Sequence, residues 1–65
     1  MRKELQIKIE LALSNAKDNG HGPELRTMTL SQLAEDLHDK DADLEIFDVD
    51  VIESVLKGIK YKDLL

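Results

Sequence analysis

The sequence predicts an all-α fold: a small domain of three helices at about residues 3–17, 30–38 and 50–60. Helix-forming Glu, Leu, Gln, Lys and Ala dominate the first of these segments. Apolar residues recur at helical spacing in the second and third. Turn-forming residues 18–23 separate the first segment from the second. With 65 residues, the chain is expected to form a single domain around a thin core.

The first segment fits two patterns. In residues 4–13, apolar and polar residues alternate as in a strand, with Leu5, Ile7, Ile9, Leu11 and Leu13 apolar. A helix would instead place one set on a common face: Leu5, Ile9, Ala12, Leu13 and Ala16. The length of about 15 residues without a turn signal favours the helix, and a strand is the alternative. In the helix, Ile7 and Leu11 lie outside the main apolar face, where a partner or a second copy of the chain could cover them.

Two clear signals precede the second helix: one ends the first helix, and the other starts the second. Gly20 is suited to ending the preceding helix in a left-handed conformation. Thr29 followed by Gln32 has the spacing of a capping box. The apolar positions after this cap follow the helical repeat, at Leu30, Leu33, Ala34 and Leu37. An amphipathic helix from Leu30 to about His38 is therefore expected.

The third helix is expected to follow a polar, acidic connection over residues 38–50. Asp48 or Asp50 is a suitable N-cap, and the lysines near the other end suit the helix dipole. Its apolar stripe consists of Val51, Ile52, Val55, Leu56 and Ile59. Gly58 weakens the last turn, and Leu64 and Leu65 are expected to fold back onto the core.

The run Met28-Thr29-Leu30-Ser31-Gln32-Leu33-Ala34-Glu35-Asp36-Leu37 resembles the first helix of helix-turn-helix and winged-helix domains. Over residues 4–60, the expected helices also follow one another in the same order as in that family. The resemblance implies a three-helix fold with residues 51–60 as the recognition helix, and DNA binding as one alternative function. The chain departs from the family in its long connection between the second and third helices and in the absence of a β-hairpin wing before Leu65.

A second alternative is a calcium-binding module. Residues 39–50 resemble an EF-hand loop, in which acidic residues at alternate positions supply oxygen ligands. The candidate ligands are Asp39, Asp41, Asp43, Glu45 and Asp50. Leu44 stands where the motif has Gly, and Asp50 stands where it has Glu, so the loop departs from the motif at two key positions.

The charge is concentrated in the middle of the chain. Residues 31–54 contain nine acidic residues and only Lys40 as a base, a balance of −8, whereas the whole chain carries −5. Such a block repels nucleic-acid phosphates and attracts basic protein surfaces. The residues expected to steer a basic partner are Glu35, Asp36, Asp39, Asp41, Asp43 and Asp48.

The sequence therefore favours a non-enzymatic regulatory or adaptor protein. We expect it to bind a basic protein partner through this acidic face and through the apolar pair Ile7 and Leu11. A homodimer that buries Ile7 and Leu11 is equally compatible. No nucleophile motif or phosphate-binding Gly loop is present, and no cofactor is expected unless the calcium alternative holds. The lack of a signal peptide or an 18-residue apolar run indicates a cytoplasmic protein that does not act at a membrane.

Overall fold

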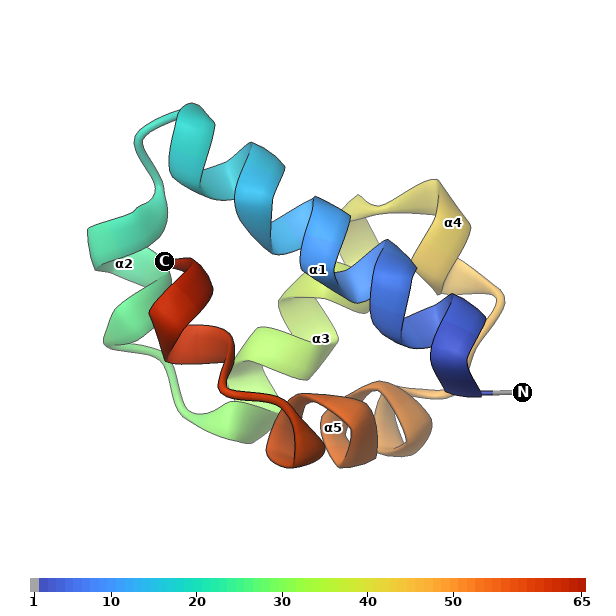
Figure 1. The fold of residues 1–65 in the computed structure, drawn as a ribbon. Coiled ribbons are helices and arrows are strands. Elements are labelled where there is room, and N and C mark those ends of the chain that lie inside the picture. The colour runs from blue at the N-terminus through green and yellow to red at the C-terminus, as the bar shows by residue number, and fades with distance from the viewer. Residues whose placement is uncertain (1) are drawn as a thin grey trace.

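The computed structural model describes residues 2–65, and all regular structure in that range is helical. Figure 1 shows the five α-helices and the final 3₁₀ turn in chain order. They are α1 (Arg2–Asp18), α2 (Gly22–Arg26), α3 (Leu30–Lys40), α4 (Ala42–Glu45), α5 (Val49–Gly58) and η1 (Tyr61–Leu64). The all-α prediction is confirmed. The three long helices correspond to the three expected ones, and three short elements are added to them.

The first segment is a helix, so the strand alternative is wrong. Leu5, Ile9 and Leu13 are at most 2% exposed, whereas Ile7 and Leu11 are 51% and 59% exposed. This division follows the helical repeat, because residues 4 apart share a face and residues 2 apart do not. The alternating apolar residues are therefore split between the core and the surface.

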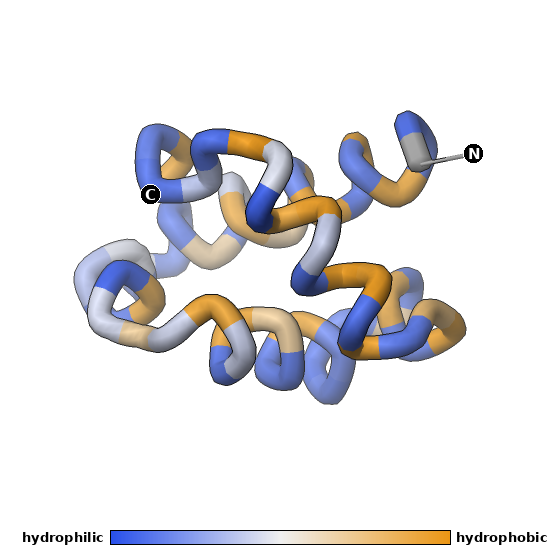
Figure 2. The backbone as a smooth tube through the Cα atoms, turned by 90° about the horizontal axis from the view of Figure 1, so that it is seen from below, coloured by the Kyte–Doolittle hydropathy of each residue, from blue (hydrophilic) through white to orange (hydrophobic). Residues whose placement is uncertain are grey.

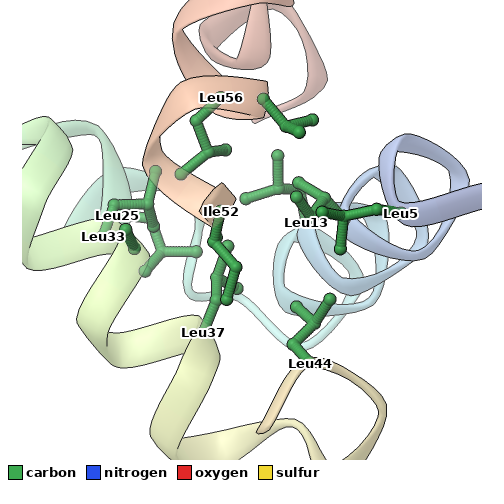
Figure 3. Close-up of a cluster of buried hydrophobic side chains, with 11 residues drawn as sticks. Leu5, Leu13, Leu25, Leu33, Leu37, Leu44, Ile52 and Leu56 are labelled. Carbon is green, nitrogen blue, oxygen red and sulfur yellow. The ribbon is translucent and has the colours of Figure 1, made fainter. Parts of the chain in front are cut away.

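The core lies where α1, α3 and α5 meet. Figure 3 shows leucine and isoleucine side chains from these helices converging, with Leu25 from α2 and Leu44 from α4 joining them. Among the described residues, the largest fully buried side chains are those of Ile9, Leu13, Leu33, Leu44, Ile52 and Leu56. Figure 2 shows that hydrophilic and hydrophobic residues alternate along the helical segments. In α1, α3 and α5 the buried residues recur at helical spacing, so each of these helices turns one side to the core.

The turn after α1 forms as expected at Gly20, whose φ of 85° lies in the left-handed region. The His21 N–H then donates to the Ala16 carbonyl oxygen at 2.9 Å, which closes the end of the helix. Pro23 lies in the first turn of α2, where its lack of an N–H costs no hydrogen bond of the helix. The chain therefore reverses tightly and brings α2 against α1.

The connection between α3 and α5 is shorter and more ordered than expected, because α3 runs on to Lys40 and α5 begins at Val49. Residues 41–48 include the one-turn helix α4. The Asp41 side chain accepts a hydrogen bond from the Asp43 N–H at 2.9 Å and caps this turn. Leu44 is fully buried and packs the connection against the core.

The last residues fold back onto the body of the molecule, as predicted. Helix α5 ends at Gly58, two residues before the expected boundary, and η1 then packs against α1. Leu64 and Leu65 pack against the core, and the Arg26 guanidinium donates to the Lys62 carbonyl oxygen at 3.0 Å. A Cβ atom on Gly22 would lie 3.0 Å from the Leu65 carbonyl oxygen, so the chain end sits closely on α2.

The capping box of α3 is present. The Gln32 N–H donates to the Thr29 hydroxyl oxygen, and the Thr29 N–H donates to the Gln32 side-chain oxygen, each at 3.2 Å. Replacing Thr29 by alanine should lower the free energy of unfolding by about 1 kcal/mol, because one N–H at the helix start loses its acceptor. Urea denaturation would measure this loss. A Ser14→Ala variant, changed at an exposed position within α1, should show no such loss; equal losses in both variants would contradict a special role for the cap.

Candidate binding site

The acidic face consists of the six predicted steering residues Glu35, Asp36, Asp39, Asp41, Asp43 and Asp48. They lie on the second half of α3, on and before α4, and at the N-cap of α5, which are consecutive elements of the chain. Asp36 and Asp41 already have partners within the molecule: Asp36 binds the Lys40 ammonium at 2.8 Å, and Asp41 caps α4. The other four are exposed, and among the described residues none of them forms an ion pair. Four of the six carboxylates are thus exposed and outside the ion pairs of the described residues.

Ile46 is the most exposed large apolar side chain of the described residues, at 78%. It directly follows α4 and stands in the sequence between Glu45 and Asp48. Its neighbours Leu44 and Phe47, three residues apart on one side of the turn, pack into the core and leave Ile46 facing outward. The sequence pattern does not indicate this exposure, because the α4 turn that orients Ile46 has no local signal of its own.

The apolar pair Ile7 and Leu11 is exposed on α1, as predicted. The two side chains are one helical turn apart on the same helix face. None of the six acidic residues lies on α1. The two parts of the expected binding surface therefore belong to different elements, and Ile46 is the exposed apolar residue that neighbours the acidic face in the chain.

A groove of about 390 Å³ lies where α1, α2 and the end of α3 meet. Ala12, Ala16, Leu25 and Leu37 contribute apolar side chains to its wall. Its polar lining consists of Asn15, Asn19, His21, Glu24, Asp36, Lys40 and Asp41. Asp36 and Asp41 belong both to the groove and to the acidic face, so the two adjoin each other. Nothing in the sequence pattern pointed to the groove, since its residues come from three separate segments.

Lys40 lines this groove and has acidic neighbours. Its ammonium is hydrogen-bonded to Asp36, and this bond together with the charges of Asp36 and Glu24 raises the pKa of Lys40 above its ordinary value. Glu24 belongs to α2 and Asp36 to α3, so carboxylates from two different helices act on the same ammonium. His21 adds a longer contact, 3.7 Å from its Nδ1 to the Glu24 carboxylate.

The residues proposed for calcium do not assemble into a site. Within residues 2–65 as described, no three His, Asp or Glu side chains are grouped so that they could hold a metal ion. Asp39 lies in α3, Asp43 and Glu45 lie in α4, and Asp50 lies in α5. The physical reason is Leu44: its burial draws residues 42–45 into a helical turn, whereas an EF-hand loop needs a Gly there to wrap around the ion.

The lysines that a DNA-binding protein would use are exposed at the other end of α5. Lys57 is in its last turn, and Lys60 and Lys62 follow it. Earlier in α5, Glu53 accepts a hydrogen bond from the Ser31 hydroxyl at 3.4 Å, which connects α5 to α3. The acidic start of α5 would face phosphates unfavourably.

Comparisons with protein-family models, with curated proteins and with solved structures find no match to this chain. Among the described residues, none of the helices has both the length and the apolar character needed to cross a membrane.

Proposed function

We propose that the chain is a non-enzymatic regulatory or adaptor protein that binds a basic protein partner through its acidic face. The exposed carboxylates of Glu35, Asp39, Asp43 and Asp48 support this proposal. They would raise the rate of encounter with a positively charged surface and fix its orientation, since long-range charge attraction acts before contact.

The observation that carries the proposal is the position of Ile46. An apolar side chain that is 78% exposed beside acidic residues has the composition of a binding surface: an apolar anchor with a charged rim. Burying it against a partner would supply the contact energy that exposed ion pairs lack.

The test is a charge reversal of the acidic face. The variant Glu35→Lys, Asp39→Lys, Asp43→Lys should bind the partner isolated with the wild-type chain at least about tenfold more weakly, because three exposed ion pairs at about 0.5 kcal/mol each are lost. Isothermal titration calorimetry at two salt concentrations would measure both the affinity and its salt dependence. An Ile46→Ala variant should weaken binding without changing the salt dependence.

A matched control changes the charge by the same amount on α1, with Glu4→Lys, Glu10→Lys and Asp18→Lys. This variant should retain most of the affinity. Equal losses in both variants would mean that only net charge matters, and the proposed face would be wrong. A chain that instead binds duplex DNA, and loses that binding when Lys57, Lys60 and Lys62 become alanine, would support the helix-turn-helix alternative in its place.

A further inference from the structure

The groove between α1, α2 and α3 combines an apolar floor with a charged rim. Ala12 and Ala16 stand one helical turn apart on α1, and their small side chains leave room above them. Leu25 and Leu37, both buried, contribute apolar walls. A surface of this kind suits the methylene stem of a long side chain, which prefers apolar contact along its length.

The rim of the groove selects for a cation. Three carboxylates line it, those of Glu24, Asp36 and Asp41, against the single ammonium of Lys40, a balance of −2 with His21 neutral. An anionic ligand would be repelled. The volume of about 390 Å³ is near the lower limit of small-molecule pockets, about 300–1,000 Å³, and fits one long side chain better than a nucleotide-sized cofactor.

Lys40 shows that this rim already binds a cation. Its ammonium lies 2.8 Å from Asp36, although the side chain is 74% exposed and free to extend into solvent. The Glu24 carboxylate on the facing helix also favours the charged ammonium, which is one cause of the raised pKa of Lys40. The molecule thus places its own cation where two helices present carboxylates, and an external cation would compete with it there.

We propose that the groove receives an arginine side chain of the basic partner, with its guanidinium taking the place of the Lys40 ammonium beside Asp36 and Glu24. This inference rests on the proposed function, which requires a basic partner. Arginine fits better than lysine because its planar guanidinium carries five N–H donors and can bind two carboxylates at once. The side-chain carbonyls of Asn15 and Asn19, which also line the groove, are further acceptors.

The probe is a blocked pentapeptide with one central arginine flanked by alanines, and its counterpart with citrulline, which has the same shape without the charge. Each is titrated into the whole ¹⁵N-labelled chain. The arginine peptide should shift the amide resonances of Ala12, Ala16 and Leu37, and the citrulline peptide should not. Lys40→Gln should tighten binding of the arginine peptide about threefold, the effect of one exposed ion pair, because the competing ammonium is gone. Glu24→Gln should weaken it by a similar factor.

Two controls separate local from general charge effects. Lys57→Gln makes the same charge change as Lys40→Gln, and Glu4→Gln makes the same change as Glu24→Gln. Both controls lie at exposed sites that do not line the groove, so both should leave the affinity unchanged. If the shifts appear only at Glu35, Asp39 and Asp43 and ignore Lys40→Gln, the groove is not the arginine site, while the proposed acidic face still stands. If the arginine peptide shifts no resonance, the groove inference is overturned, and the charge-reversal experiment alone decides the proposed function.

Discussion

Replacing Leu33 by alanine should lower the free energy of unfolding by about 2–5 kcal/mol. Leu33 is completely buried, and Figure 3 places it among the side chains that converge between the helices. The change removes apolar contacts and leaves a cavity that the surrounding helices cannot fill. A domain of 65 residues has a total stability of about 3–10 kcal/mol, so this loss is a large fraction of it. Urea denaturation followed by circular dichroism would measure it.

The matched control is Ile46→Ala, which removes a similar number of atoms from a side chain that is 78% exposed. It should change the stability by less than about 0.5 kcal/mol. The pair also separates the roles of the two residues, because Ile46→Ala is expected to weaken partner binding and Leu33→Ala to weaken the fold. Similar stability losses in the two variants would show that Leu33 is not in the core.

Ending the chain at Lys60 should lower the free energy of unfolding by about 3 kcal/mol. The deletion removes Tyr61, Leu64 and Leu65, which are half-buried against the core and should each contribute about 1 kcal/mol, roughly half of the value for full burial. It also removes the carbonyl of Lys62, the acceptor for Arg26. The melting temperature of the truncated chain should fall, and calorimetry would measure the change.

A variant with Arg26→Ala separates the two causes of this loss. It removes the hydrogen bond to Lys62 but keeps the apolar contacts of η1, and it should cost less than about 1 kcal/mol because that bond is exposed to solvent. If Arg26→Ala destabilised the chain as much as the truncation, the hydrogen bond rather than apolar packing would hold η1 in place.

The long helices could be predicted because their signals are local. The Thr29–Gln32 capping box and the helical repeat of apolar residues in α3 require only neighbouring residues, and both are present. The short elements α2, α4 and η1 could not be predicted. Helices of four or five residues are unstable alone, and tertiary packing stabilises them. Leu44 shows this: its burial holds residues 42–45 in a turn.

The candidate site, too, was predictable only where its signals are local in the sequence. The exposure of Ile7 and Leu11 follows from the helical repeat of α1, and the concentration of carboxylates is a property of the sequence. The outward position of Ile46 depends on the α4 turn, so no repeat indicated it. The groove joins Ala12 of α1 to Glu24 of α2 and Lys40 of α3, and residues so far apart in the chain carry no common pattern.

The packing of η1 on α1 sets the order in which the fold can be completed during synthesis. Helix α1 leaves the ribosome before the other described elements, yet part of its covering is supplied by Tyr61–Leu64, the last of them. While the chain is growing, the apolar side of α1 can contact α3 and later α5, but it stays partly open to solvent and to chaperones until η1 is made. The contact joins segments more than 40 residues apart, so its loop closure costs more entropy than contacts between neighbouring elements. Closure of this side of α1 therefore waits until η1 has been synthesised.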